Sequence, residues 1–291
     1  MDFPQKTSLI RWRNSYEISL LTPAKLNLYL NVVGKYPGGF HEIESIMARI
    51  TLCDELIIRK DKMTKIICND KSLENEGNLS LKAVFLLKKE LRIKENFLLI
   101  LKKRIPQGSG LGGASSNAAF TLLGINEILG LRLSKKELFS LGKELGSDVN
   151  FFLADTPLAL VEGRGEKINC WKFLPSLKFF IVYPNFRSST SLVFNNLEVK
   201  GKLTKSFSNV NIIFYALKNK DNALLKEGLF NILERVAFRI YPKLKRKKEL
   251  LKELGFVMTG SGSSFFALKE KEKFKLRNFF KNWLIFEVSV F

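Results

Sequence analysis

The stretch that decides the fold of this chain reads Pro106-Gln107-Gly108-Ser109-Gly110-Leu111-Gly112-Gly113-Ala114-Ser115-Ser116. It follows an apolar run at residues 97–101, and three basic residues lie between the two. The residues after it that share one face of a helix are Ala118, Leu122, Ile125 and Leu129. The pattern predicts a strand, a glycine-rich loop and then the N-terminus of a helix.

This arrangement suits a polyphosphate. Glycine lets backbone N–H groups approach an anion closely, and the positive end of the helix dipole then faces the negative charge. Ser109, Ser115 and Ser116 add hydroxyl groups that can donate to phosphate or bind magnesium. The stretch has neither the Gly-Lys-Ser/Thr ending of a P-loop nor an acidic residue at dinucleotide-fold spacing. Taken alone, a flexible surface loop with a serine cap is the simpler interpretation.

Length and composition set the class of protein. The 291 residues are enough for one large domain or two modest ones, and the 46% hydrophobic and 26% charged residues are ordinary for a globular chain. No apolar run reaches the roughly 18 residues that span a bilayer, and the N-terminus lacks the pattern of a secretory signal. Cys53, Cys68 and Cys170 form no metal or disulfide spacing, which favours a reducing cytoplasm.

The net charge of +20 allows nucleic acid, an anionic membrane surface or an anionic small molecule as partner. The densest basic cluster, residues 243–248, is predicted to be the solvated face of a helix. No nucleic-acid motif accompanies it. A bound anionic substrate would gain from the charge in any case.

Two further polar positions stand near apolar patterns. Lys25 and Asn27 fall on one face of a strand predicted from the alternation at residues 25–32, where solvent exposure is the ordinary interpretation. Asp148 follows a helix that opens with the capping-box pattern of Ser134 and Glu137, and a lone aspartate there is usually a cap for the next turn.

The order of elements predicts two α+β lobes with a cleft between them. Residues 1–15 are expected to be an irregular basic extension, residues 16–165 an N-terminal domain that contains the glycine loop, and residues 166–291 a C-terminal domain. A helix is predicted to begin at Asn78. The pattern of residues 209–254 is largely helical with breaks near Gly228 and Pro242, and residues 256–268 read as strand, glycine turn and strand.

Three stretches in this order resemble the motifs of the GHMP kinases, which act on galactose, homoserine, mevalonate and related alcohols. They are Pro23-Ala24-Lys25-Leu26-Asn27-Leu28, the glycine loop, and Thr259-Gly260-Ser261-Gly262-Ser263-Ser264. The resemblance covers roughly residues 16–268. It implies a two-lobed α+β fold with an N-terminal lobe like ribosomal protein S5 domain 2, a C-terminal α/β-plait lobe, and an active site in the cleft.

Other stretches are similar to one branch of that family, whose acceptor is a cytidine diphosphate derivative of methylerythritol. They are Gly39-Phe40-His41-Glu42, residues 146–152, and residues 231–234 with Tyr241 and Pro242 behind them. Asn150 stands in place of a usual proline, Ile232 in place of an aspartate and Ala114 in place of a glycine. None of these departures removes a presumed catalytic group.

The resemblance implies specific roles. Asp148 would be the general base and Lys25 would stabilise charge developing near the γ-phosphate. ATP, with Mg²⁺, would be bound by Pro106, Gln107, Gly108, Ser109, Gly110, Leu111, Gly112, Gly113, Ala114, Ser115 and Ser116, with Asn78 and Lys103 near the adenine. Ser116 is the candidate magnesium contact. Residues implied in substrate binding are Asn27, Phe40, His41, Phe194, Gly260, Ser261 and Gly262.

In that branch the cytosine lies between two aromatic rings and is read by a histidine. Phe40 and Phe194 are the matching rings, and stacking of this kind contributes about 1–3 kcal/mol per base. We therefore expect a small-molecule kinase, monomeric or homodimeric, with no membrane, no obligatory protein partner and no nucleic acid. Two alternatives remain, a homoserine-type or mevalonate-type kinase and a non-catalytic nucleic-acid-binding relative.

Overall fold

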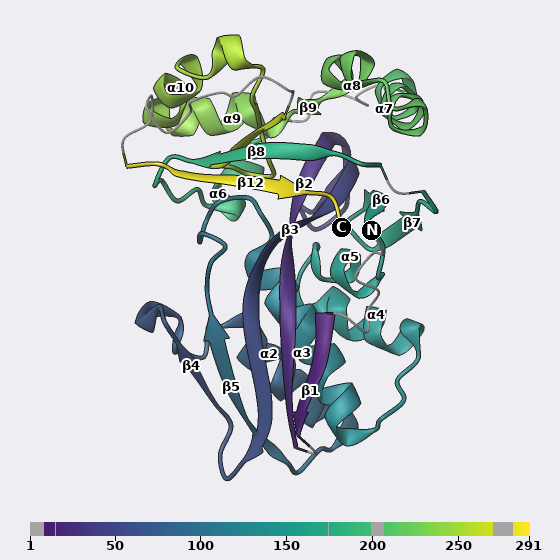
Figure 1. The fold of residues 1–291 in the computed structure, drawn as a ribbon, viewed down its shortest axis with the longest axis vertical. Helices are drawn as coiled ribbons and strands as arrows, with labels where there is room; N and C mark the ends of the chain where they lie inside the picture. The colour runs from purple at the N-terminus through teal and green to yellow at the C-terminus, as the bar shows by residue number, and fades with distance from the viewer. Residues whose placement is uncertain (1–8, 15, 174, 199–206, 270–281) are drawn as a thin grey trace.

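The structure is a computed structural model that describes residues 9–14, 16–173, 175–198, 207–269 and 282–291. It has two layers, a large sheet backed by helices and a smaller sheet that crosses above it (Figure 1). The α+β class and the two-lobed arrangement expected from the sequence are confirmed. Among the described residues, no helix is both long enough and apolar enough to cross a membrane.

The larger sheet is built on two long antiparallel strands that run through its centre. Its elements are β1 (Ile10–Asn14), β2 (Glu17–Lys35), β3 (His41–Asp61), β4 (Lys65–Cys68), β5 (Asn96–Lys102), β6 (Leu158–Gly163), β7 (Lys167–Cys170) and β9 (Phe230–Asn231). The main path is β1-β2-β3-β5-β4, while β6 pairs with β3 and β7, and β9 pairs with β2. The expectation of an irregular extension up to residue 15 is wrong for Ile10–Asn14, because these residues pair with β2.

Strand β2 is not regular, and this decides where its polar residues lie. Its pairing with β3 shifts register at three places, one of them between Asn27 and Tyr29. The simple alternation predicted from Lys25 onward therefore breaks. Lys25 and Asn27 are 3% and 1% exposed, so they are not solvent-facing residues of a half-buried strand.

Four helices cover one face of this sheet (Figure 1). They are α2 (Leu79–Leu91), α3 (Gly113–Leu129), α4 (Lys135–Leu145) and the short α5 (Val149–Leu153). The predicted starts are confirmed, because the Asn78 side chain caps α2 and both hydrogen bonds of the Ser134–Glu137 capping box are present in α4. Helix α3 lies centrally and packs on α2, α5 and β2, which places its first turn at the middle of the molecule.

The smaller sheet has the order β10-β11-β8-β12, and all its pairings are antiparallel. Its strands are β8 (Lys178–Tyr183), β10 (Val257–Met258), β11 (Phe265–Leu268) and β12 (Leu284–Ser289). The strand–turn–strand predicted at residues 256–268 is confirmed as β10 and β11. The helices of this layer are α6 (Thr190–Asn195), α7 (Phe207–Asn219), α8 (Asn222–Gly228), α9 (Leu233–Ile240) and α10 (Pro242–Glu249). Short 3₁₀ turns occur at Lys71–Leu73 and Lys252–Leu254.

The two layers are joined by more than the covalent connection between them. Strand β9 lies parallel to β2, with Leu30 opposite Asn231. The buried Asn231 amide donates to the carbonyl oxygens of Met258 and Gly260 at 2.7 and 2.8 Å. One asparagine therefore ties the large sheet to the β10–β11 turn. The chain leaves the larger sheet after β7 and enters the smaller one at β8, and the division between residues 165 and 166 stays a prediction.

Candidate functional site

A cavity of about 780 Å³ lies where the layers meet. Its walls come from β2, the start of α2, the glycine loop, the residues before α5, the β6–β7 turn, α6 and the β10–β11 turn. Almost every residue singled out from the sequence lines it. Those on its wall are Lys25, Asn27, Phe40, His41, Asn78, Lys103, residues 106–115, Asp148, Phe194, Gly260 and Ser261. Ser116 and Gly262 do not line it.

Lys25 and Asp148 face each other in this cavity. The Lys25 Nζ lies 3.5 Å from Asp148 Oδ2. The lysine side chain is 4% exposed and the aspartate side chain 28% exposed. The ammonium is thus fixed in the wall, while the carboxylate stays open to a ligand. Two sequence positions more than 120 residues apart meet as a charged pair, as the resemblance implied.

Asn27 is the second partner of the Lys25 ammonium. Its Oδ1 accepts a hydrogen bond from Lys25 Nζ, and its Nδ2 donates to Ser45 Oγ at 2.8 Å. Its backbone N–H donates to Thr259 Oγ1 at 3.0 Å. The side-chain oxygen of Asn27 therefore orients the lysine, and its backbone N–H holds the β10–β11 turn against β2.

Asp148 is the residue directly before α5, and its backbone angles are helical, with φ −85° and ψ −9°. Asn150, which stands where a proline was expected, is buried in α5 and leaves this geometry intact. The Asp148 side chain makes no capping hydrogen bond to α5. This carboxylate is therefore not consumed as a helix cap, which was the ordinary interpretation of a lone aspartate.

The glycine loop fits because two of its glycines have no room for a side chain. A Cβ on Gly112 would lie 2.9 Å from Lys25 Cγ, and one on Gly110 would lie 2.1 Å from the carbonyl oxygen of Thr259. Both glycines also have positive φ angles, 72° and 78°. The loop is thus pressed between Lys25 and the backbone of the other lobe.

Backbone hydrogen bonds from both lobes hold the same loop in place. The N–H of Ser188 donates to the Gly108 carbonyl oxygen at 2.9 Å, and that of Ser264 donates to the Ser109 carbonyl oxygen at 3.0 Å. The Lys25 N–H donates to the Leu111 carbonyl oxygen at 2.9 Å. These bonds take up carbonyl groups, so the loop can present N–H groups rather than oxygens to the cavity.

The three loop serines differ in their surroundings. Ser109 Oγ donates to the Pro106 carbonyl oxygen at 2.6 Å and serves the loop itself. Ser115 lines the cavity. Ser116 is fully buried, and its Oγ finds no hydrogen-bond partner within the described part of the chain.

Asn78 and Lys103 line the cavity, but local structure already uses their side chains. Asn78 caps α2 through its Oδ1 and donates from Nδ2 to the Leu73 carbonyl oxygen at 3.0 Å. The Lys103 ammonium pairs with the Asp54 carboxylate and donates to Asn117 Oδ1 at 3.2 Å. These two side chains are therefore held in place by contacts within the protein.

Aromatic and cationic residues gather at the other end of the cavity. The rings of His41 and Phe194 are 5.5 Å apart and tilted by 46°. The Arg164 guanidinium lies 3.4 Å from the centre of the Phe40 ring. All four residues line the cavity, and Phe40 is half exposed. Three aromatic rings and one guanidinium therefore line the same cavity.

His41 keeps a neutral ring at physiological pH. Burial lowers its pKa below the ordinary value of 6.5, and the Lys35 cation lowers the pKa further. Its Nε2 atom is buried and has no hydrogen-bond partner among the residues that the structure describes. A neutral imidazole with a free ring nitrogen can donate to, or accept from, the edge of a ligand.

Two residues of the site were not singled out in the sequence. Arg164 was part of a predicted connecting turn, and its position between two glycines gave no chemical signal. Asp54 is one of two adjacent acids, Asp54 and Glu55, within the β-prone residues 46–58, and it is completely buried in β3. Charged residues inside a run of strand-forming residues are a usable signal, because a buried carboxylate needs partners.

Comparisons with known proteins agree with this geometry. The family descriptions "GHMP kinases N terminal domain" and "GHMP kinases C terminal" match residues 78–163 and 213–284. A 4-diphosphocytidyl-2-C-methyl-D-erythritol kinase of Protochlamydia amoebophila is 38% identical over 269 residues, covering 90% of this chain and 88% of the relative. The chain belongs to the GHMP kinase family. A second kinase of the same name, from Citrifermentans bemidjiense, is 36% identical and covers 88% of this chain and 91% of its own.

Solved structures of the GHMP kinase fold superpose well on the chain. A crystal structure of 4-(cytidine 5'-diphospho)-2C-methyl-D-erythritol kinase has a TM-score of 0.73 at 29% identity and covers 93% of this chain and 99% of its own. A homoserine kinase from Cytophaga hutchinsonii has a TM-score of 0.71 at 19% identity, covering 96% and 97%. The second likeness shows the shared fold.

The fit of Gly110 can be tested by adding one carbon atom. Gly110→Ala should lower the free energy of unfolding by at least about 3 kcal/mol, because backbone strain adds to a clash with a carbonyl oxygen that cannot move aside. Gly130→Ala is the matched control, with φ 60° and no described atom within 4 Å of the added Cβ. It should lose only about 1–2 kcal/mol. Urea titration of both variants measures the difference, and equal losses would contradict the close packing of the loop.

The protonation of His41 can be followed by NMR without overlap from other histidines, because it is the only histidine in the chain. A proton NMR titration of the folded protein should give a pKa below 6.5, and the same titration in urea should return it to its ordinary value. Since the neutral ring is favoured in the folded state, its contribution to stability is present above the unfolded pKa. That contribution is lost as the pH falls through the folded value. A folded pKa at or above 6.5 would show that burial does not govern this ring.

Proposed function

We propose that this chain is an ATP-dependent kinase that phosphorylates the 2-hydroxyl of 4-diphosphocytidyl-2-C-methyl-D-erythritol, in the non-mevalonate route to isoprenoid precursors. Relatives at 34–38% identity carry that enzyme's name. The observation that carries the proposal is the Lys25–Asp148 pair, which lies in one cavity with the glycine loop and the His41 ring. The proposed phosphate-binding loop, the proposed general base Asp148 and the aromatic surface proposed to bind the cytosine line one cavity.

Asp148 is proposed as the general base. Its carboxylate is partly exposed and is not used by α5, so it can accept the proton of an acceptor hydroxyl placed beside it. Lys25 is held by Asn27 next to that carboxylate, and its charge would stabilise the negative charge that develops on the transferred phosphoryl group. The pair therefore activates the nucleophile and stabilises the transition state without forming a covalent intermediate.

The glycine loop is proposed to bind the phosphates of ATP. The loop residues and the start of α3 line the cavity, and the loop's position is fixed from both lobes. This fixed placement brings the γ-phosphate to the acceptor in line, which supplies much of the rate enhancement in phosphoryl transfer. Gly260 lies close enough to Lys25 that a Cβ there would be 3.3 Å from the ammonium, so the β10–β11 turn closes the same centre.

Magnesium fits this site. The ion takes oxygen ligands, commonly one or two carboxylates together with phosphate oxygens. We propose that Ser116 serves it together with Ser115, since Ser115 lines the cavity and the buried Ser116 hydroxyl lacks a partner among the described residues. When bound, magnesium neutralises phosphate charge.

The acceptor's cytosine is proposed to lie against Phe40 and Phe194, with neutral His41 at its edge. The rings offer faces for stacking, and the free Nε2 of His41 offers one hydrogen bond. This surface favours a nucleotide-linked acceptor over a small alcohol such as homoserine or mevalonate. We expect the enzyme to act in the cytoplasm, as a monomer or homodimer.

Turnover with different acceptors tests the proposed substrate. ADP release from ATP should depend on 4-diphosphocytidyl-2-C-methyl-D-erythritol, with homoserine and mevalonate giving a small fraction of that rate at equal concentration. A second test uses Phe194→Ala, which removes one stacking ring and should raise the KM for the cytidine acceptor by about tenfold or more. A rate with homoserine or mevalonate that equals the rate with the cytidine acceptor would overturn the proposal.

The role of Asp148 is tested by Asp148→Asn, which keeps the shape of the side chain and removes the base. The rate of phosphoryl transfer should fall by a factor on the order of 10²–10⁴, while ATP binding measured by calorimetry stays largely unchanged. Asp155→Asn is the matched control, because that aspartate is exposed and pairs with Arg49 away from the cavity. Turnover near the wild-type rate in Asp148→Asn would refute the assignment of the base.

A further inference from the structure

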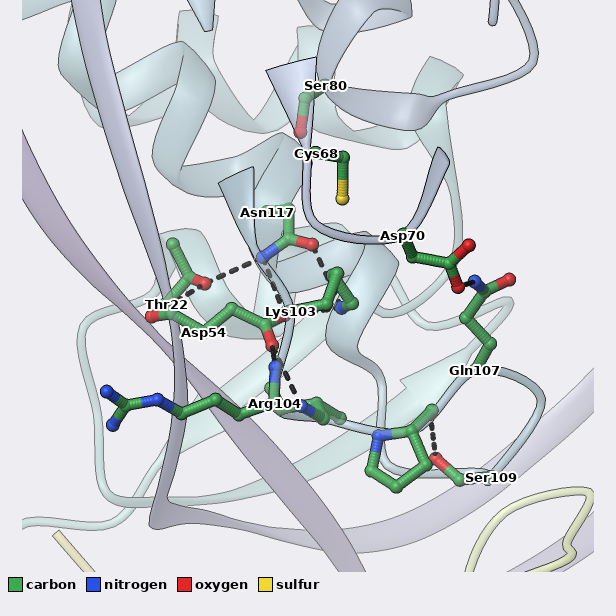
Figure 2. A network of polar contacts seen from close by, with 12 residues as sticks. Thr22, Asp54, Cys68, Asp70, Ser80, Lys103, Arg104, Gln107, Ser109 and Asn117 are labelled. Carbon is green, nitrogen blue, oxygen red and sulfur yellow. Dashed lines mark hydrogen bonds and ion pairs between the residues drawn. The ribbon is translucent and has the colours of Figure 1, made fainter. Parts of the chain in front are cut away.

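Asp54 accepts four hydrogen bonds although it lies outside the catalytic pair. Its Oδ1 accepts from the backbone N–H groups of Arg104 and Ile105, at 2.7 and 2.8 Å. Its Oδ2 accepts from Lys103 Nζ and, at 3.0 Å, from Asn117 Nδ2. The residue is completely buried in β3, and Figure 2 shows these donors converging on it.

The four donors come from both ends of the glycine loop. Lys103, Arg104 and Ile105 lead directly into the loop, and Asn117 is in the first turns of α3, directly after it. A single carboxylate therefore joins the entrance and the exit of the loop, as Figure 2 shows. Asn117 Nδ2 also donates to Thr22 Oγ1 at 2.6 Å, which ties this junction to β2, the strand of Lys25.

The loop also lies directly on these partners. A Cβ on Gly113 would be 3.0 Å from Lys103 Nζ and 2.9 Å from Ile105 Cγ2. The start of α3 thus packs closely against Lys103 and Ile105, which Asp54 holds through the Lys103 ammonium and the Ile105 backbone N–H. A change in the Lys103–Asp54 pair is therefore expected to shift the first turn of α3, which lines the cavity.

We propose that Asp54 is a positioning residue for phosphoryl transfer, which sets the spacing of the loop ends and thereby the placement of the loop N–H groups relative to Lys25. This inference rests on the proposed function, because it assigns those N–H groups to ATP. Asp54 acts through the loop and does not line the cavity.

The chemistry requires an aspartate at this position. An ionised carboxylate only accepts hydrogen bonds, so it can satisfy all four donors, whereas an asparagine would turn its NH₂ group toward two of them. The Lys103 cation makes the buried carboxylate tolerable, since a buried charge needs a paired and hydrogen-bonded partner. The Lys103 charge is thus neutralised by a fully buried carboxylate, which distinguishes Lys103 from Lys25, whose partner Asp148 is partly exposed.

Asp54→Asn tests the inference through the two Michaelis constants. The KM for ATP should rise about tenfold or more, the effect expected when charge-assisted hydrogen bonds are lost, while the KM for the cytidine acceptor changes by less than about twofold. Glu55→Gln is the matched control, because this neighbouring acid pairs with Arg13 and Lys102 at the surface and should leave both constants unchanged. Equal changes in both constants, or no change in either, would overturn the inference.

Two further variants separate positioning from folding. Asn117→Ala removes one tether and should weaken ATP binding severalfold even if Asp54→Asn does not fold. In the double variant Asp54→Asn with Lys103→Met, the unpaired buried cation is gone, so thermal stability should recover while ATP binding stays weak. Recovery of ATP binding along with stability would show that Asp54 only neutralises Lys103.

Calorimetry with a non-hydrolysable ATP analogue keeps this result independent of the acceptor. If the wild-type protein binds the analogue and Asp54→Asn binds it about tenfold more weakly, the inference about the loop stands whatever acceptor is used. If the wild-type protein binds the analogue but does not phosphorylate the cytidine acceptor, the proposed substrate fails alone. Unchanged analogue binding in Asp54→Asn overturns the inference alone.

Discussion

The close contact between the glycine loop and the layers on either side of it governs the rest of this structure. Gly112 lies on the carbon chain of Lys25, and Gly110 meets the backbone at Thr259. Since nothing larger than hydrogen fits at these contacts, the loop takes its position from both lobes at once. The lysine, the loop and the β10–β11 turn are therefore placed relative to one another by packing, before any ligand arrives.

The two lysines beneath the loop have different electrostatic roles. Lys103 is paired with a fully buried carboxylate, so its charge is neutralised within the protein and stabilises the position of the chain. Lys25 is paired with a partly exposed carboxylate and a neutral amide, so its charge remains available at the cavity. A net charge of +20 acts over the whole surface, whereas the Lys25 arrangement places positive charge in the cavity where we propose that the reaction takes place.

The sequence was informative wherever function depends on a local motif. The glycine loop predicts an anion-binding site from its own residues, whereas the roles of Lys25, Asp148 and His41 were implied by the family resemblance. The structure brings all of them to one cavity. The pairing of Ile10–Asn14 with β2 and the roles of Asp54 and Arg164 could not be read in that way. Each depends on residues distant in sequence: Asp54 is a site only because residues about 50 positions later fold back onto it. The broken alternation in β2 has the same cause, since its register is set by β3.

The pairing of β9 with β2 has a consequence for the order in which the chain can fold during synthesis. Leu30 pairs with Asn231, which is synthesised about 200 residues later, so this part of the sheet edge stays uncovered until then. At the usual rate of translation, about 5–20 residues per second, the delay is roughly 10–40 s. The part of β2 around Leu30, beyond the residues that pair with β1, thus lacks this partner for most of the time the ribosome needs to make the protein. Such distant contacts also make folding slow. A kinase of this build becomes competent late, when its C-terminal half has closed the sheet that its N-terminal half began.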